Sequence, residues 1–100
     1  MKKQYLKHKN VCKVTFSLPK EATKSAKSVH LVGEFNNWEV SATPMKKMKD
    51  GSFQAIMQLE PGRSYQFRYL IDGEKWENDW TADHYVPSSF GAAENSVVVV

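Results

Sequence analysis

Apolar and polar residues alternate along much of this chain, and this period of two is the feature that most constrains its fold. Residues 52–59, SFQAIMQL, place Phe53, Ala55, Met57 and Leu59 on one face of an extended strand. Mainly polar side chains fall on the opposite face. The stretch is therefore predicted to be a strand with one side buried and one side facing solvent.

Residues 65–71, YQFRYLI, repeat the pattern around an arginine. One phase of the alternation holds only large apolar or aromatic side chains, namely Tyr65, Phe67, Tyr69 and Ile71. Arg68 lies in the opposite phase, with Gln66 and Leu70 beside it. If the aromatic phase forms the core, Arg68 must point outward toward solvent or a ligand.

Further strands and turns complete an all-β pattern. Strand-like stretches occur at residues 11–18 (VCKVTFSL), 28–35 (SVHLVGEF) and 96–100 (SVVVV). Tight turns are indicated at Asp50-Gly51, Pro61-Gly62 and Asp72-Gly73. About seven short strands in a chain of this length favour an immunoglobulin-like β-sandwich over a closed barrel, although the pattern alone separates these two poorly.

The length and composition indicate one globular domain. The chain has 100 residues, of which 41% are hydrophobic and 25% charged. We expect a single domain over residues 11–100, preceded by a basic arm at residues 1–10 that is solvated and partly disordered. Cys12 is the only cysteine, and the sequence has neither an export signal nor a membrane-length apolar run. We therefore expect a cytoplasmic protein without a membrane partner.

No set of residues suggests catalysis or metal binding. His8, His30 and His84 do not stand at metal-ligand spacing with Cys12 or with acidic residues. Phosphate-binding glycine loops and the nucleophile elbow are also missing from the sequence. We therefore expect neither enzyme activity nor a cofactor.

Four acidic residues cluster late in the chain: Glu74, Glu77, Asp79 and Asp83. Paired carboxylates can cleave glycosides, but this chemistry needs a defined separation that spacing in the sequence does not fix. The pattern favours a solvated acidic loop.

Aromatic residues are enriched in the predicted loops. Trp38 follows two asparagines, Trp76 and Trp80 bracket a short acidic segment, and Phe90 precedes a glycine. A single loop tryptophan is more often packed against a sandwich edge than exposed for binding. Several together, with amides and an outward arginine, are suited to the apolar faces and hydroxyl rims of sugar rings.

Three stretches resemble carbohydrate-binding module family 48, the glycogen-binding type. They are VHLVGEFNNWE, DGSFQAIMQLEPGRSYQFRYLIDGEKW and FGAAENSVVVV. Modules of this family occur in isoamylases, in branching enzymes and in the β subunit of the AMP-activated protein kinase. The resemblance implies an immunoglobulin-like sandwich of the early-set type that binds α-1,4-glucan (glycogen, starch or maltooligosaccharides), without catalysis, with a glucan-metabolising enzyme as a further partner.

The same resemblance implies roles for individual residues. Trp38 and Trp76 match the two stacking tryptophans of the family, with Lys75 as an extra residue before the second. Arg68 stands where the kinase-subunit modules carry a lysine that donates to sugar hydroxyls. Either cation can donate, but only arginine offers a planar fork.

Other positions match less directly. Phe90 stands where those modules have a leucine that presses into the concave face of a curled glucan. Asn95 lies in the asparagine region of the family, and Glu94 competes with it for the sugar-contacting position. Trp80 has no counterpart, so it either enlarges the binding platform or seals the sandwich.

Two alternatives use the same residues. Exposed tryptophan and arginine are also common anchors of protein interfaces, so the chain could be a protein-interaction module with a degenerate sugar site. Basic charge and aromatics on a small β fold also resemble single-stranded nucleic-acid binding. The second alternative is disfavoured, because the aromatics of residues 65–71 share the core phase and the segments around Trp76 and Trp80 are acidic.

Overall fold

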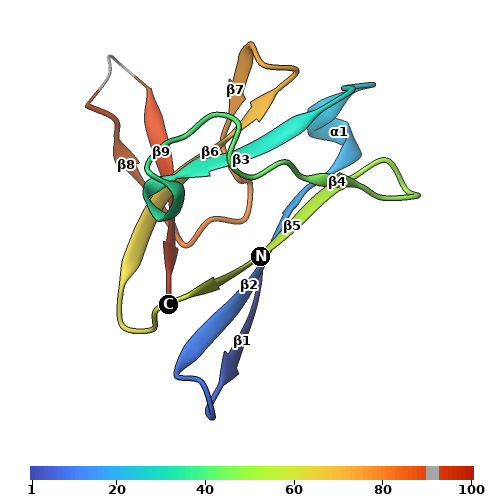
Figure 1. The fold of residues 1–100 in the computed structure, drawn as a ribbon. Coiled ribbons are helices and arrows are strands. Elements are labelled where there is room, and N and C mark those ends of the chain that lie inside the picture. The colour runs from blue at the N-terminus through green and yellow to red at the C-terminus, as the bar shows by residue number, and fades with distance from the viewer. Residues whose placement is uncertain (90–92) are drawn as a thin grey trace.

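The computed structural model describes residues 1–89 and 93–100 and shows an all-β sandwich (Figure 1). In chain order the elements are β1 Lys2–Leu6, β2 Val11–Leu18, α1 Lys20–Thr23, β3 Val29–Gly33, η1 Glu34–Asn36, β4 Lys46–Lys47, β5 Phe53–Leu59, β6 Ser64–Ile71, β7 Lys75–Glu77, β8 His84–Pro87 and β9 Glu94–Val99. No helix within the described residues is long and apolar enough to span a membrane. The predicted fold class is confirmed.

The strands form two antiparallel sheets. The first sheet has the order β1-β2-β5-β4, and the second has the order β3-β6-β9-β8, with β7 also pairing with β6. The two layers can be followed by their labels in Figure 1. Strand β6 is the centre of the second sheet, because it pairs with β3, β7 and β9.

The core lies between the sheets and consists mainly of strand side chains that alternation predicts to face inward, with Ala22, Ala26 and Met45 added from α1 and the connections. Phe16 of β2 and Phe67 of β6 are fully buried, and their ring centroids are 5.0 Å apart. Burial of one such ring stabilises a fold by about 1.5–3 kcal/mol relative to leaving it exposed. Phe35, which follows β3, packs on Phe16 with a centroid distance of 5.5 Å. Phe35 thus anchors this segment to the core.

Gly33 allows β3 to approach β6 closely at the end where the site begins. A Cβ atom at Gly33 would lie 2.6 Å from the carbonyl oxygen of Gln66 and 2.6 Å from the Cβ atom of Phe67. Real Cβ contacts are essentially never this short. The glycine in the sequence GEFNNW is therefore required by space rather than by an unusual backbone angle.

The N-terminal segment differs from its expectation. Lys2–Leu6, expected within a partly disordered arm, is strand β1 and pairs with β2 along its full length. Lys3 forms an ion pair with Asp83 at 2.7 Å, and the Tyr5 hydroxyl donates to the Val100 carbonyl at 3.2 Å. These long-range contacts order a stretch whose few apolar residues give only a weak strand signal.

The Lys3–Asp83 contact also depends on pH in a defined direction. Burial raises the pKa of the Asp83 carboxyl, but the hydrogen bonds from Lys3 and from the Val99 amide outweigh burial and hold the pKa below its usual value. A lowered carboxyl pKa contributes stability above the unfolded pKa and loses it as pH falls through the folded pKa. The contact is therefore fully effective at neutral pH and is lost only in acid.

The acidic segment is also not wholly solvated, which corrects a second expectation. Asp79 is only 1% exposed. Its carboxylate accepts hydrogen bonds from the Tyr69 hydroxyl at 2.5 Å and from the Thr81 amide and hydroxyl at 2.7 Å each. A buried carboxylate is tolerated when its oxygens are hydrogen-bonded in this way. Asp79 therefore fastens the connection between β7 and β8 beneath the sheet.

The remaining differences are small elements. The structure has nine strands in its described residues, compared with the roughly seven expected. Strands β4 and β7 contain two and three residues, which is too short for alternation to be recognised. Pairing with longer neighbours, β5 and β6, defines both of them.

We predict that Tyr69→Phe destabilises the domain by about 1–3 kcal/mol, because it removes a hydroxyl donor from a buried carboxylate. Burial raises the pKa of Tyr69 well above its ordinary value, with the charge of Asp79 adding to the effect, so Tyr69 is a neutral donor at pH 7. Thermal unfolding should show a midpoint lower by roughly 4–8 °C per kcal/mol. Tyr65→Phe is the matched control, since Tyr65 lies on the same face of β6 without a hydroxyl hydrogen bond to the described residues. Equal destabilisation by both changes would contradict this assignment.

Candidate functional site

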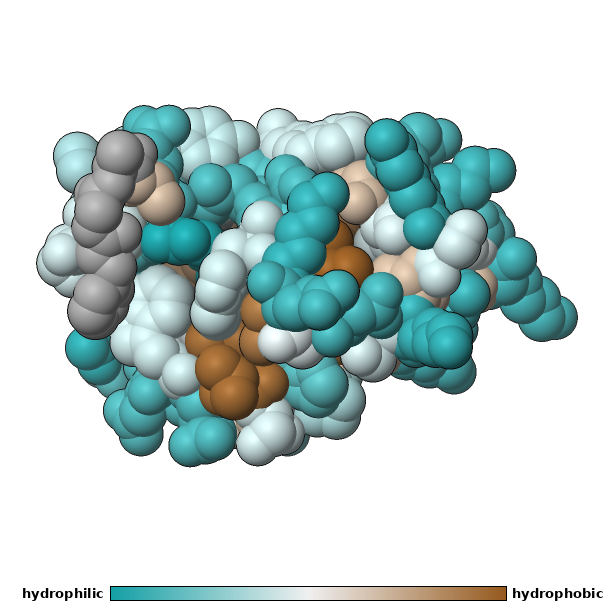
Figure 2. All heavy atoms as spheres, turned by 90° about the horizontal axis from the view of Figure 1, so that it is seen from above, coloured by the Kyte–Doolittle hydropathy of each residue, from teal (hydrophilic) through white to brown (hydrophobic). Residues whose placement is uncertain are grey.

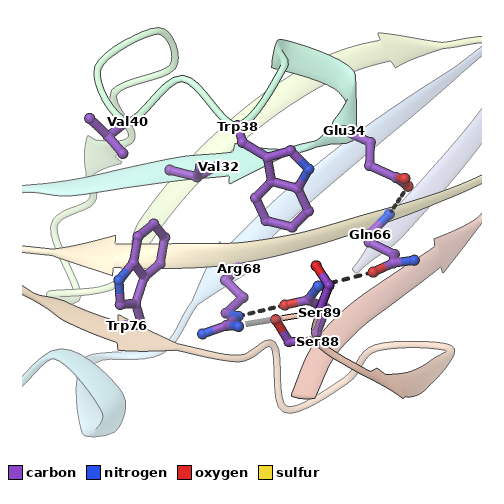
Figure 3. A pocket seen from close by; sticks show the side chains of 10 residues that line it. Val32, Glu34, Trp38, Val40, Gln66, Arg68, Trp76, Ser88 and Ser89 are labelled. Atoms are coloured by element: carbon purple, nitrogen blue, oxygen red, sulfur yellow. Dashed lines mark hydrogen bonds between the residues drawn. The ribbon is translucent and has the colours of Figure 1, made fainter. Parts of the chain in front are cut away.

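A hollow lies on the outer face of the second sheet. It has a volume of about 560 Å³, within the range of small-ligand pockets. Its side chains come from β3, β6, β7 and β9, from η1 and the segment that follows it, and from the residues just after β8 (Figure 3). The face seen from above in Figure 2 is mostly hydrophilic or intermediate in hydropathy, with strongly hydrophobic side chains visible only in small central areas.

Asn36 builds the turn that carries Trp38. Its side-chain oxygen accepts a hydrogen bond from the Gly33 amide at 3.0 Å. Its side-chain nitrogen donates to the Leu31 carbonyl at 2.9 Å and to the Thr43 hydroxyl at 3.0 Å. One amide thus ties the short η1 turn to the end of β3 and to the returning chain.

The two residues after Asn36 have left-handed backbones. Asn37 has φ of 58° and Trp38 has φ of 57°. Asparagine adopts this region readily, but an aromatic residue pays a steric cost, so the Trp38 backbone is held by its surroundings. The Trp38 amide donates to the Gly33 carbonyl at 2.8 Å. The reversal leaves the Trp38 indole 38% exposed at the edge of the pocket.

Trp76 reaches the pocket from β7. It pairs with Leu70 of β6, so its side chain lies on the outer face of the sheet, in the same phase as Arg68. The indole is 41% exposed and lines the pocket. Leu70, which shares this outward phase, is itself only 6% exposed and does not line the pocket.

Arg68 lies between the two tryptophans in Figure 3, on the strand that separates them. It pairs with Val32 of β3, whose buried side chain forms part of the pocket wall. The Arg68 guanidinium carbon is 5.7 Å from the centre of the Trp76 ring, which is a cation–π contact. Its Nε atom donates to the side-chain oxygen of Asn95 at 2.6 Å. The outward direction predicted for Arg68 is observed.

Asn95 and Glu94 occupy different positions relative to this pocket. Asn95 is 6% exposed, lines the pocket and contacts Arg68. Glu94 is exposed and does not line it, and its carbonyl accepts a hydrogen bond from Asn78 at 3.0 Å. Neighbouring side chains of a strand point to opposite faces, which accounts for the difference. Of the two competing positions, the structure therefore brings Asn95 to the pocket.

The two remaining predicted residues are not part of this group. Trp80 is 55% exposed, but its indole nitrogen donates to the Glu77 carboxylate at 3.2 Å and its side chain does not line the pocket. Phe90 lies outside the described residues. The binding roles of Trp80, Glu94 and Phe90 remain predictions from the family resemblance.

Six lining residues were not assigned to the site by sequence reasoning: Val32, Glu34, Val40, Gln66, Ser88 and Ser89. Glu34 follows Gly33 directly, and its carboxylate accepts a hydrogen bond from the backbone N–H of Gln66 at 2.6 Å. A strand ending at a short turn could have indicated Glu34, but Val40 and the two serines carry no local signal. Their positions depend on how the loops return to the sheet.

The charge of the pocket is balanced. Among its described lining residues, Arg68 supplies one positive charge and Glu34 one negative charge. Apolar walls from Val32 and Val40 accompany the two indoles. Such a surface offers ring faces, donors and acceptors without a net charge, which suits a neutral ligand rich in hydroxyl groups.

The described part of the chain shows no candidate metal-binding site. No cluster of three or more histidine, cysteine, aspartate or glutamate residues there is arranged to hold a metal ion. The side chains that gather in the pocket are instead aromatic, amide, hydroxyl and guanidinium groups.

Comparison with known proteins agrees with this geometry. No curated protein sequence matches the chain closely enough to serve as a relative. A family model described as the glycogen recognition site of AMP-activated protein kinase matches residues 15–100, which include every described residue of the pocket. The chain therefore belongs to this glycogen-recognition family of carbohydrate-binding modules.

Proposed function

We propose that this domain binds α-1,4-linked glucan by stacking sugar rings on Trp38 and Trp76 while Arg68 donates to hydroxyl groups. Membership of a glycogen-recognition family supports glucan binding in general. The observation that carries the finer proposal is the convergence of two half-exposed indoles and an outward guanidinium in one pocket of about 560 Å³. These groups come from three separate segments of the chain.

The chemistry of each group fits this ligand. The face of a glucose ring presents C–H groups, which pack on a flat indole, whereas its rim presents hydroxyl groups. The Nη1 and Nη2 atoms of Arg68 make no hydrogen bond to any residue that the structure describes, so both are available as donors. Glu34 offers a carboxylate acceptor on the other side of the pocket.

The expected affinity is modest. Each well-stacked ring contributes on the order of 1 kcal/mol, by analogy with other aromatic contacts. Association itself costs several kcal/mol, so a short oligosaccharide should bind with Kd from about 1 mM to tens of micromolar. Retention on glycogen or starch would then depend on many equivalent sites along the polymer.

The cellular setting follows as part of the same proposal. We place the domain in the cytoplasm as a non-catalytic module that serves a glucan-metabolising enzyme. Support comes from the single buried cysteine, Cys12, and from the absence of a catalytic constellation among the described lining residues. Measurement of hydrolase activity on maltoheptaose would test the non-catalytic part directly.

Trp38→Ala and Trp76→Ala should each weaken binding of maltoheptaose about fivefold, which corresponds to about 1 kcal/mol per ring, and should abolish retention on amylose. The thermal midpoint should change little, because both side chains are already partly exposed. Titration followed by tryptophan fluorescence or calorimetry gives the affinities. Tyr5→Ala is the control, since Tyr5 is an exposed aromatic on the other sheet. Unchanged affinity in both tryptophan variants would refute the proposed platform.

Trp80→Ala distinguishes the two roles left open for that residue. Trp80 does not line the pocket, so we expect maltoheptaose affinity to be retained. A loss comparable with that of Trp76→Ala would show that the platform extends beyond the pocket.

Arg68→Lys should reduce maltoheptaose affinity less than Arg68→Ala, because lysine keeps a donor while losing the planar fork. Equal losses in the two variants would indicate that the fork geometry itself is required.

The affinity of the domain for maltoheptaose, a neutral glucan, should be almost the same at low and high NaCl concentration. A steep fall with salt, or tighter binding of a single-stranded oligonucleotide, would instead indicate a phosphate ligand.

A further inference from the structure

A continuous chain of contacts crosses the floor of the pocket, from the turn that carries Trp38 to the ring of Trp76. The Glu34 carboxylate accepts from the backbone N–H of Gln66 at 2.6 Å, and the Gln66 side-chain oxygen accepts from the Asn95 side-chain nitrogen at 2.9 Å. Asn95 in turn accepts from Arg68 Nε at 2.6 Å, and the guanidinium lies over Trp76 (Figure 3). Asn95 is the link between the sheet and the guanidinium.

The hydrogen bonds of Asn95 are directed at its neighbours. An asparagine side chain has one carbonyl oxygen and one NH₂ group, and here the oxygen serves Arg68 while the nitrogen serves Gln66. The residue is only 6% exposed, so most of its surface is covered by protein. Arg68 is less buried and keeps four of its five N–H groups, those on Nη1 and Nη2, free of hydrogen bonds to the described residues.

We infer that Asn95 is a positioning residue that fixes the Arg68 guanidinium over Trp76 and turns its terminal nitrogens toward the ligand. This inference rests on the proposed glucan site, but it assigns Asn95 a different role from direct contact with sugar. A free arginine side chain has many rotamers, and choosing one before the ligand arrives lowers the entropy cost of binding. The hydrogen bond at Nε selects that rotamer and leaves the fork unobstructed.

Two titration series separate positioning from direct contact. In the otherwise unchanged protein, Asn95→Ala should weaken maltoheptaose binding about three- to tenfold, the effect expected for one hydrogen bond. In an Arg68→Lys background the same change should weaken binding less than about twofold, because lysine has no Nε–H donor for Asn95 to hold. If Asn95 contacts the sugar itself, the loss will be equal in both backgrounds, which would overturn the inference.

Nuclear magnetic resonance of the two arginine side chains gives a readout that needs no ligand. Arg63 is the matched control, because it also lies over an aromatic ring, that of Tyr65, at 5.4 Å, but its hydrogen bond to Glu60 uses Nη1 rather than Nε. The Hε proton of Arg68 should exchange with water much more slowly than that of Arg63. Asn95→Ala should abolish the difference. Equally fast exchange of both protons in the unchanged protein would refute the positioning role.

Asn95→Asp is the conservative variant. Aspartate keeps an acceptor for Arg68 Nε. The side-chain amide of Gln66 can turn so that its nitrogen donates to the second carboxylate oxygen of the aspartate. We expect slow Arg68 Hε exchange to persist and maltoheptaose affinity to fall less than in Asn95→Ala. Loss of slow exchange in Asn95→Asp would contradict the inference even if Asn95→Ala unfolds. Slow exchange without any maltoheptaose binding would instead refute the proposed function and leave the positioning contact standing.

Discussion

The packing of the β6 aromatic side chains against the opposite sheet is the interaction on which the rest of the structure depends. Phe67 contacts Phe16 and Tyr69 at centroid distances of 5.0 and 5.8 Å, and both Phe67 and Tyr69 are fully buried. These contacts decide which face of β6 points inward. Arg68 lies between the two rings in sequence, so it must face outward. The strand that holds the sandwich together therefore also directs the central cation of the site.

Each tryptophan of the site is supported by polar contacts rather than by its own burial. The Asn36 amide fixes the turn beneath Trp38, and the buried Asp79 carboxylate fastens the connection that follows β7 and Trp76. Because these supports lie outside the pocket, the indoles can remain partly exposed without becoming loose. A surface prepared in this way loses less conformational freedom when a ligand binds.

Much of the fold, and part of the site, could be predicted from local pattern. Alternation correctly gave the inward and outward faces of β6, and the outward direction of Arg68 followed from it. Contacts between residues far apart in the sequence could not be predicted in this way. The ordering of β1 by Asp83 and Val100, the burial of Asp79, and the presence of Ser88 and Ser89 in the pocket all depend on such contacts. The choice between Glu94 and Asn95 also needed the register of β9, because neighbouring residues differ in the face that they present.

The alternation of β6 also limits how this module can change over evolutionary time. Inserting or deleting one residue in the strand would shift its register and exchange its two faces, so that an arginine would enter the hydrophobic interior and a phenylalanine would meet water. Substitution at Arg68 or Gln66 carries no such penalty. Point mutations in this strand can therefore change ligand preference, whereas insertions or deletions of one residue within it would disrupt the core.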